Sequence, residues 1–112
     1  MVATISRPMN LEAFLEMPET KPESEFIIGA IKQKPMPQGK HSRLQIKLGT
    51  AINQVTELPK IAYAFPELRC TFGGASIVPD IAVLRWERIP RDEDGQVANR
   101  FLTYPDWTIE IL

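Results

Sequence analysis

The sequence contains one cysteine, Cys70, and one histidine, His41, among its 112 residues. One cysteine cannot form an internal disulfide, and one of each cannot supply the four ligands of a Cys/His metal site. No run of about 18 apolar residues is present, so we expect no transmembrane helix. Residues 1–8 show no basic stretch leading into an apolar segment, which predicts a cytoplasmic protein without a signal peptide and without membrane association.

A large net charge is absent as well. The total of -1 argues against a protein that coats nucleic acid by bulk charge. The charge is nevertheless uneven, with net values of -3, +5 and -3 for residues 1–31, 32–69 and 70–112. An apolar fraction of 44% and a charged fraction of 24% are typical of a globular protein, and the length predicts a single domain spanning residues 1–112.

Two short elements are expected near the start of the chain. Asn10, followed by apolar and acidic residues, predicts the N-cap of a helix that ends at Pro18. Residues 26–34 predict a β-hairpin whose turn centres on Gly29 and Ala30.

The middle of the chain predicts one long helix followed by strands. Ser42 and Gln45 form a capping-box pattern, and the apolar residues after them recur at helical spacing as far as Val55. Residues 61–65 and 68–72 then show extended, alternating patterns that favour strands.

The last third predicts a strand over residues 76–85, a long polar loop over residues 86–105 and a second strand over residues 107–112. Chain ends are normally solvated, whereas this sequence stops inside an apolar strand pattern. We therefore expect the domain to be incomplete at its C-terminus.

Asp80 and Glu110 stand out because each is a lone carboxylate within an apolar strand pattern. Buried carboxylates are costly unless they are paired or bind a cation, so two on neighbouring strands predict a site for a hard metal ion. If they lie buried against each other, Asp80→Ala should stabilise the metal-free protein. The alternative is that each acid meets solvent or a cation such as Arg69.

Two further residues are candidates for the same site. Glu25 directly precedes an apolar strand and could be a third acid, although such residues more often face water. His41 stands at the entrance to the long helix, where it could act on a phosphate or a proton. Its alternative is a local hydrogen bond at the helix start.

Basic residues in the middle segment predict a contact with a nucleic-acid backbone. A solvated surface is the alternative reading of such a set. The residues are Lys32, Lys34, Lys40, Arg43 and Lys47.

Four segments together resemble the Uma family of bacterial restriction-endonuclease-like proteins, within the PD-(D/E)xK nuclease superfamily. The resemblance covers nearly all of the chain, in the same order. The segments are residues 25–29 (EFIIG), 35–37 (PMP) with His41, 76–83 (SIVPDIAV) and 105–112 (PDWTIEIL).

The resemblance implies an α+β fold with a restriction-endonuclease-like core, in which helices flank a mixed β-sheet. It also implies a DNA endonuclease that uses Mg²⁺ or Mn²⁺. Asp80, Glu110 and the backbone carbonyl of Ile111 would hold the metal ion, while Glu25 and His41 would be further catalytic residues. Lys34, Lys40, Arg43 and Lys47 remain the candidates for contacts with DNA.

The chain departs from the superfamily pattern at Leu112, which stands where the lysine of the E-x-K motif is expected. Leucine can neither stabilise a phosphoryl transition state nor orient water. The resemblance therefore leaves a second possibility, a catalytically inactive domain that binds nucleic acid or protein. An incomplete sheet with an exposed edge would also favour a homodimer.

Overall fold

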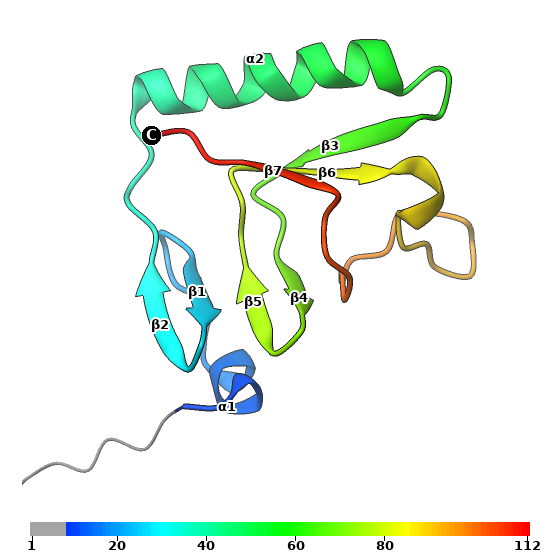
Figure 1. Cartoon of the computed structure of the whole chain (residues 1–112). Helices are drawn as coiled ribbons and strands as arrows, with labels where there is room; N and C mark the ends of the chain where they lie inside the picture. Colours follow the sequence, from blue (N-terminus) through cyan, green and yellow to red (C-terminus); the bar gives the residue numbers. More distant parts are fainter. Residues whose placement is uncertain (1–8) are drawn as a thin grey trace, which may run out of the picture.

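The computed structural model describes residues 9–112, so the prediction about a signal peptide in residues 1–8 lies outside the described residues. Figure 1 shows the long helix α2 lying across one sheet, with two hairpins beside that sheet and α1 below them. In chain order the elements are α1 (Leu11–Glu16), β1 (Ser24–Ile27), β2 (Ala30–Gln33), α2 (Gly39–Thr56), β3 (Ala62–Pro66), β4 (Cys70–Phe72), β5 (Ala75–Ile77), β6 (Ile81–Arg85), the short 3₁₀ helix η1 (Trp86–Arg88) and β7 (Trp107–Ile109).

The expected α+β class is confirmed, but the strands form two antiparallel sheets instead of one mixed sheet. One sheet has the strand order β2-β1-β5-β4 and the other has the order β3-β6-β7. Two-residue turns connect β1 to β2 and β4 to β5, and so short a connection can join antiparallel strands only. Each turn thus sets the relative direction of the two strands in its own hairpin, and β1 and β5 join the two hairpins into one sheet.

The turn of the first hairpin lies one residue earlier than predicted, at Ile28 and Gly29, which both have positive φ. The second hairpin turns at Gly73 and Gly74, again with positive φ at both residues. Two-residue turns of this kind match the right-handed twist of the flanking strands, and glycine adopts them without strain.

The predicted strand over residues 76–85 is wrong as a single element. Its first part is β5 and its second part is β6, and the two strands belong to different sheets. Pro79 lies between them and has no N–H to donate to a ladder, so the chain changes sheets there. Val78, Pro79 and Asp80, which form the crossing, are all buried.

Strand β6 lies between the two core clusters, because both of its faces are covered. On one face Ile81 and Val83 pack with Leu48 and Ile52 of α2. On the other face Leu84 belongs to a second cluster, which also contains Cys70, Ala82, Ile89 and Phe101. Burial on both faces explains why this strand has an almost uninterrupted apolar sequence.

Both predicted helices form, but the capping box in the second is wrong. In α1 the Asn10 side chain caps the helix by accepting a hydrogen bond from the backbone N–H of Ala13 at 2.8 Å. Helix α2 begins earlier than predicted, at Gly39, with Gln38 as its N-cap. Gln45 is therefore buried within the helix and faces β6.

Residues 86–105, predicted as a long polar loop, pack in part against the core. They begin with η1, and Ile89 and Phe101 are buried in the second core cluster. The backbone N–H of Thr71 also donates to the carbonyl of Phe101 at 3.0 Å. Within residues 9–112, no helix is both long and apolar enough to cross a membrane.

Candidate functional site

The pairing of β6 with β7 brings Asp80 and Glu110 together. Ile81 lies opposite Ile109 in this antiparallel ladder, so extending the register by one residue puts Asp80 opposite Glu110. Beyond the ladder, the backbone N–H of Ile111 donates to Asp80 Oδ2 at 2.7 Å. The two carboxylates are thus set by strand register at the point where the chain leaves both strands.

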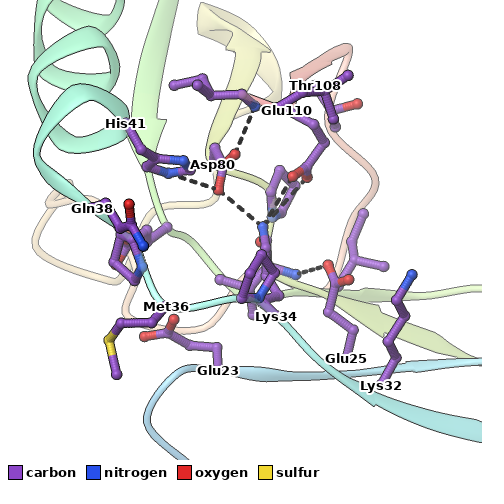
Figure 2. Close-up of a pocket in the computed structure, with 18 of the residues that line it drawn as sticks. Glu23, Glu25, Lys32, Lys34, Met36, Gln38, His41, Asp80, Thr108 and Glu110 are labelled. Carbon is purple, nitrogen blue, oxygen red and sulfur yellow. Dashed lines mark hydrogen bonds and ion pairs between the residues drawn. The ribbon is translucent and has the colours of Figure 1, made fainter.

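The ammonium group of Lys34 lies between these two carboxylates (Figure 2). Lys34 Nζ is 3.1 Å from Asp80 Oδ1 and 3.1 Å from Glu110 Oε2. It also donates to the carbonyl of Val78. Oxygens from three residues therefore converge on one positive charge.

Asp80 is held from several sides in addition to this ion pair. Its backbone carbonyl accepts hydrogen bonds from Gln45 Nε2 at 2.7 Å and from the backbone N–H of Glu67 at 3.2 Å. The residue is only 4% exposed, whereas the Glu110 side chain is 50% exposed. One carboxylate is therefore a fixed, buried group and the other borders solvent.

The two further candidates lie at the edges of this cluster. His41, in the first turn of α2, has its Nε2 3.5 Å from Asp80 Oδ1. Glu25 of β1 does not bind the ammonium group, but its Oε2 accepts the backbone N–H of Val78 at 2.9 Å. Glu25 thus anchors the segment that leads into Asp80. Val78 in that segment provides the carbonyl that accepts from Lys34.

The site favours a charged Asp80 and a charged Lys34. Burial raises the pKa of Asp80, but the Ile111 N–H and the Lys34 ammonium outweigh it, so the pKa lies below its ordinary value. Burial likewise lowers the pKa of Lys34, yet the hydrogen bonds and charges of Asp80 and Glu110 reverse this and raise it. Each group stabilises the charged form of the other.

The pKa of Glu110 is raised, in the opposite direction to that of Asp80. Burial raises its pKa, and the nearby negative charges of Asp80 and Glu25 add to this effect. Lys34 opposes the shift without cancelling it. Two carboxylates that share one ammonium group are therefore under-compensated, which is a condition that a more highly charged cation would relieve.

The cluster opens into a pocket of about 710 Å³ that is lined by residues from both sheets and from the start of α2. The predicted basic set is divided with respect to this pocket. Lys32, Lys34 and Lys40 line it, whereas Arg43 and Lys47 are exposed further along α2. Lys34 differs from the others because its ammonium group is paired with carboxylates.

Arg69, considered above as a partner for Asp80 or Glu110, lies elsewhere. Its guanidinium binds Glu19 at 2.8 Å and the Ser76 hydroxyl at 3.0 Å. Sequence reasoning missed Lys34 as the partner of both acids, and it missed Gln45 as the residue that holds Asp80. The available signal for Gln45 was its place on the same helical face as Leu48 and Ile52.

Replacing Gln45 by leucine should lower the free energy of unfolding by about 2 kcal/mol, because the buried carbonyl of Asp80 loses a hydrogen bond. Urea unfolding measures this change. Gln54→Leu, at an exposed position on the same helix, is the matched control and should leave stability nearly unchanged. Equal stability of the two variants would show that the Gln45 hydrogen bond does not hold Asp80.

Comparison with known proteins identifies the family. A family model described as "Putative restriction endonuclease" matches residues 11–112. The chain belongs to the Uma2 family. The resemblance inferred from the sequence is thereby confirmed.

A solved structure agrees with the Uma2 assignment. A crystal structure titled as a putative nuclease belonging to DUF820, from Anabaena variabilis ATCC 29413, is 60% identical in sequence and superposes with a TM-score of 0.90. The match covers 94% of this chain and 59% of that one, so this Uma2 chain corresponds to little more than half of its structural relative. No curated protein matches the chain.

The residues of this Uma2 site fit a hard cation. Among residues 9–112, no three His, Cys, Asp or Glu side chains are grouped so that they could hold a metal ion. The cation position is instead surrounded by two carboxylates and the carbonyl of Val78, with the ammonium group of Lys34 at its centre. Oxygen donors of this kind are the ligands that Mg²⁺ and Mn²⁺ prefer.

Proposed function

We propose that this chain is the metal-binding part of an endonuclease that hydrolyses DNA phosphodiester bonds with Mg²⁺ or Mn²⁺. The observation that supports this proposal is the convergence of Asp80 and Glu110 on a single cation position. Membership of the Uma2 family supports a nuclease as the enzyme class.

In this proposal Asp80, Glu110 and the carbonyl of Ile111 hold the metal ion. When bound, the ion polarises the scissile phosphate and lowers the pKa of a water molecule. The water oxygen bonds to phosphorus, one P–O ester bond breaks, and the departing oxygen takes a proton, which leaves a phosphomonoester and a hydroxyl end. The backbone N–H of Ile111 donates to Asp80 Oδ2, which holds this residue beside the carboxylate, and Ile111 also lines the pocket.

The protein side chains around the metal ligands then have distinct tasks. His41 lies against Asp80 Oδ1 and restrains that carboxylate from the side of α2. Glu25 holds the Val78 peptide, and through it the crossing that positions Asp80. Both are therefore proposed as positioning residues that act through Asp80.

The exposed basic residues of α2 are proposed to contact the DNA backbone. Lys40, Arg43 and Lys47 recur at intervals of three and four residues, so they lie on one face of the helix. Lys40 also lines the pocket that contains the two carboxylates. A phosphate chain running along this face would thus pass the metal position.

Cleavage of supercoiled plasmid DNA in Mn²⁺ tests the proposal. Glu110→Gln should reduce the rate of nicking by at least about 100-fold, because a neutral amide cannot take the place of a charged metal ligand. Glu57→Gln, at an exposed position near the other end of α2, is the control with the same chemical change. Equal nicking by wild type and Glu110→Gln would contradict the proposal.

A second candidate is a catalytically inactive domain that binds nucleic acid or protein. The observation in its favour is Lys34, whose ammonium group already occupies the position between the two carboxylates and neutralises one of their two charges. Leu112, at the position of the motif lysine, also favours it. Binding of DNA without nicking, and with the same affinity in Glu110→Gln, would select this candidate.

A further inference from the structure

We propose that Lys34 and the divalent metal ion are alternative occupants of the Asp80–Glu110 site, and that metal binding moves the Lys34 ammonium group onto the scissile phosphate. This inference rests on the proposed nuclease function and deepens it. Lys34 then has two positions, one for the metal-free protein and one for the complex with substrate.

Lys34 and a metal ion cannot occupy the site together, because both would bind the same carboxylate oxygens. Lys34 Nζ bonds Asp80 Oδ1 and Glu110 Oε2 at 3.1 Å each, and these are the oxygens that a metal ion would need. Two cations on the same pair of oxygens would repel each other strongly at such short range. A divalent ion must therefore displace the ammonium group before it can bind both carboxylates.

The lysine is built so that its end can move while its base stays in place. Its backbone N–H is fixed to the carbonyl of Glu23 at 2.8 Å, directly after β2. The four-carbon stem is flexible, and its end lies in the open pocket that also contains Lys40 and His41. The ammonium group can thus leave the carboxylates without any movement of the sheet.

Phosphodiester hydrolysis is favoured by a positive charge beside the scissile phosphate, next to the metal position. The residue two positions after Glu110 is Leu112, which offers none. Within the described residues, Lys34 is the sole lysine or arginine that forms an ion pair with Asp80 or Glu110. Once displaced, its ammonium group would be available beside the metal position as a donor for the charge that develops on the phosphate during hydrolysis.

The test is a pair of measurements on Lys34→Met: the affinity for Mn²⁺ alone, by calorimetry, and the rate of plasmid nicking at saturating Mn²⁺. The variant should bind Mn²⁺ about tenfold more tightly, because the competing occupant is gone. It should nick DNA about 100-fold more slowly, because the phosphate loses its donor. A merely structural role for Lys34 would weaken both properties together.

Two further variants make the result specific. Lys34→Arg retains a positive charge on a flexible stem, so its Mn²⁺ affinity should stay close to that of the wild type. Lys60→Met makes the same substitution at an exposed lysine in the turn between α2 and β3 and should change neither quantity. Retained folding of each variant is checked by its thermal unfolding.

The outcomes separate this inference from the function on which it rests. If the wild type binds Mn²⁺ and nicks DNA, but Lys34→Met binds no more tightly or nicks equally fast, the inference about Lys34 is overturned and the nuclease proposal stands. If neither the wild type nor Lys34→Met binds Mn²⁺, the proposed function fails and the inference fails with it.

Discussion

Replacing Asp80 by alanine is expected to lower the free energy of unfolding by about 3 kcal/mol in the absence of any metal ion. The substitution leaves the Lys34 ammonium group, whose side chain is only 13% exposed, beside one carboxylate instead of two. It also leaves the backbone N–H of Ile111 without its acceptor. Urea unfolding of both proteins in the presence of a chelator measures the difference.

Asp80→Asn separates the charge from the shape of the side chain. Because the folded protein lowers the pKa of Asp80 below its ordinary value of 3.8, the stabilising contribution of this carboxylate is present above that pH. The contribution is lost as the pH falls through the lowered value. The difference in stability between the wild type and Asp80→Asn should therefore shrink as the solution is acidified below about pH 4.

From the sequence, Asp80→Ala is expected to stabilise the metal-free protein if Asp80 and Glu110 lie buried against each other. In the structure Lys34 lies between the two carboxylates, so that condition is not met and the opposite sign is expected. A metal-free Asp80→Ala protein that is as stable as the wild type, or more stable, would contradict the pairing with Lys34.

Replacing Phe101 by alanine should lower the free energy of unfolding by about 4 kcal/mol, because it opens a cavity in the core. Phe101 is 2% exposed and belongs to the cluster that covers one face of β6. Its ring also packs edge-on against Phe65 at a centroid distance of 5.2 Å. Thermal and urea unfolding measure the loss.

The adjacent Leu102 provides the control, because it is 64% exposed and its replacement by alanine should change stability by less than about 0.5 kcal/mol. A similarly small effect of Phe101→Ala would show that residues 86–105 are not packed against the sheet. The predicted contrast between these neighbours thus tests the packing of the segment that the sequence presents as a polar loop.

Much of the fold is predictable from local patterns in the sequence. The cap at Asn10, the hairpin signal around Gly29 and the apolar spacing of α2 each report on nearby residues and were interpreted correctly in kind. The change of sheet at Pro79 was missed because it depends on which distant strands pair. Local periodicity contains no information on such pairing.

The site shows the same division between local and long-range information. Asp80 and Glu110 could be selected because a charge within an apolar strand is visible in the sequence. The sequence groups Lys34 with the other basic residues of the middle segment as a candidate contact with nucleic acid, because nothing in its local pattern points to Asp80 or Glu110. Its pairing with residues 46 and 76 positions away arises only when the hairpin, the crossing and β7 meet in space.

The most direct test of the central claim, that Asp80 and Glu110 hold a divalent cation, is calorimetric titration of Mn²⁺ into the wild-type protein and into Glu110→Gln. We predict saturable binding of one ion to the wild type and a loss of that binding in the variant, whose fold is verified by its unfolding curve. Absence of binding to the wild type, or equal affinities for the two proteins, would contradict the claim.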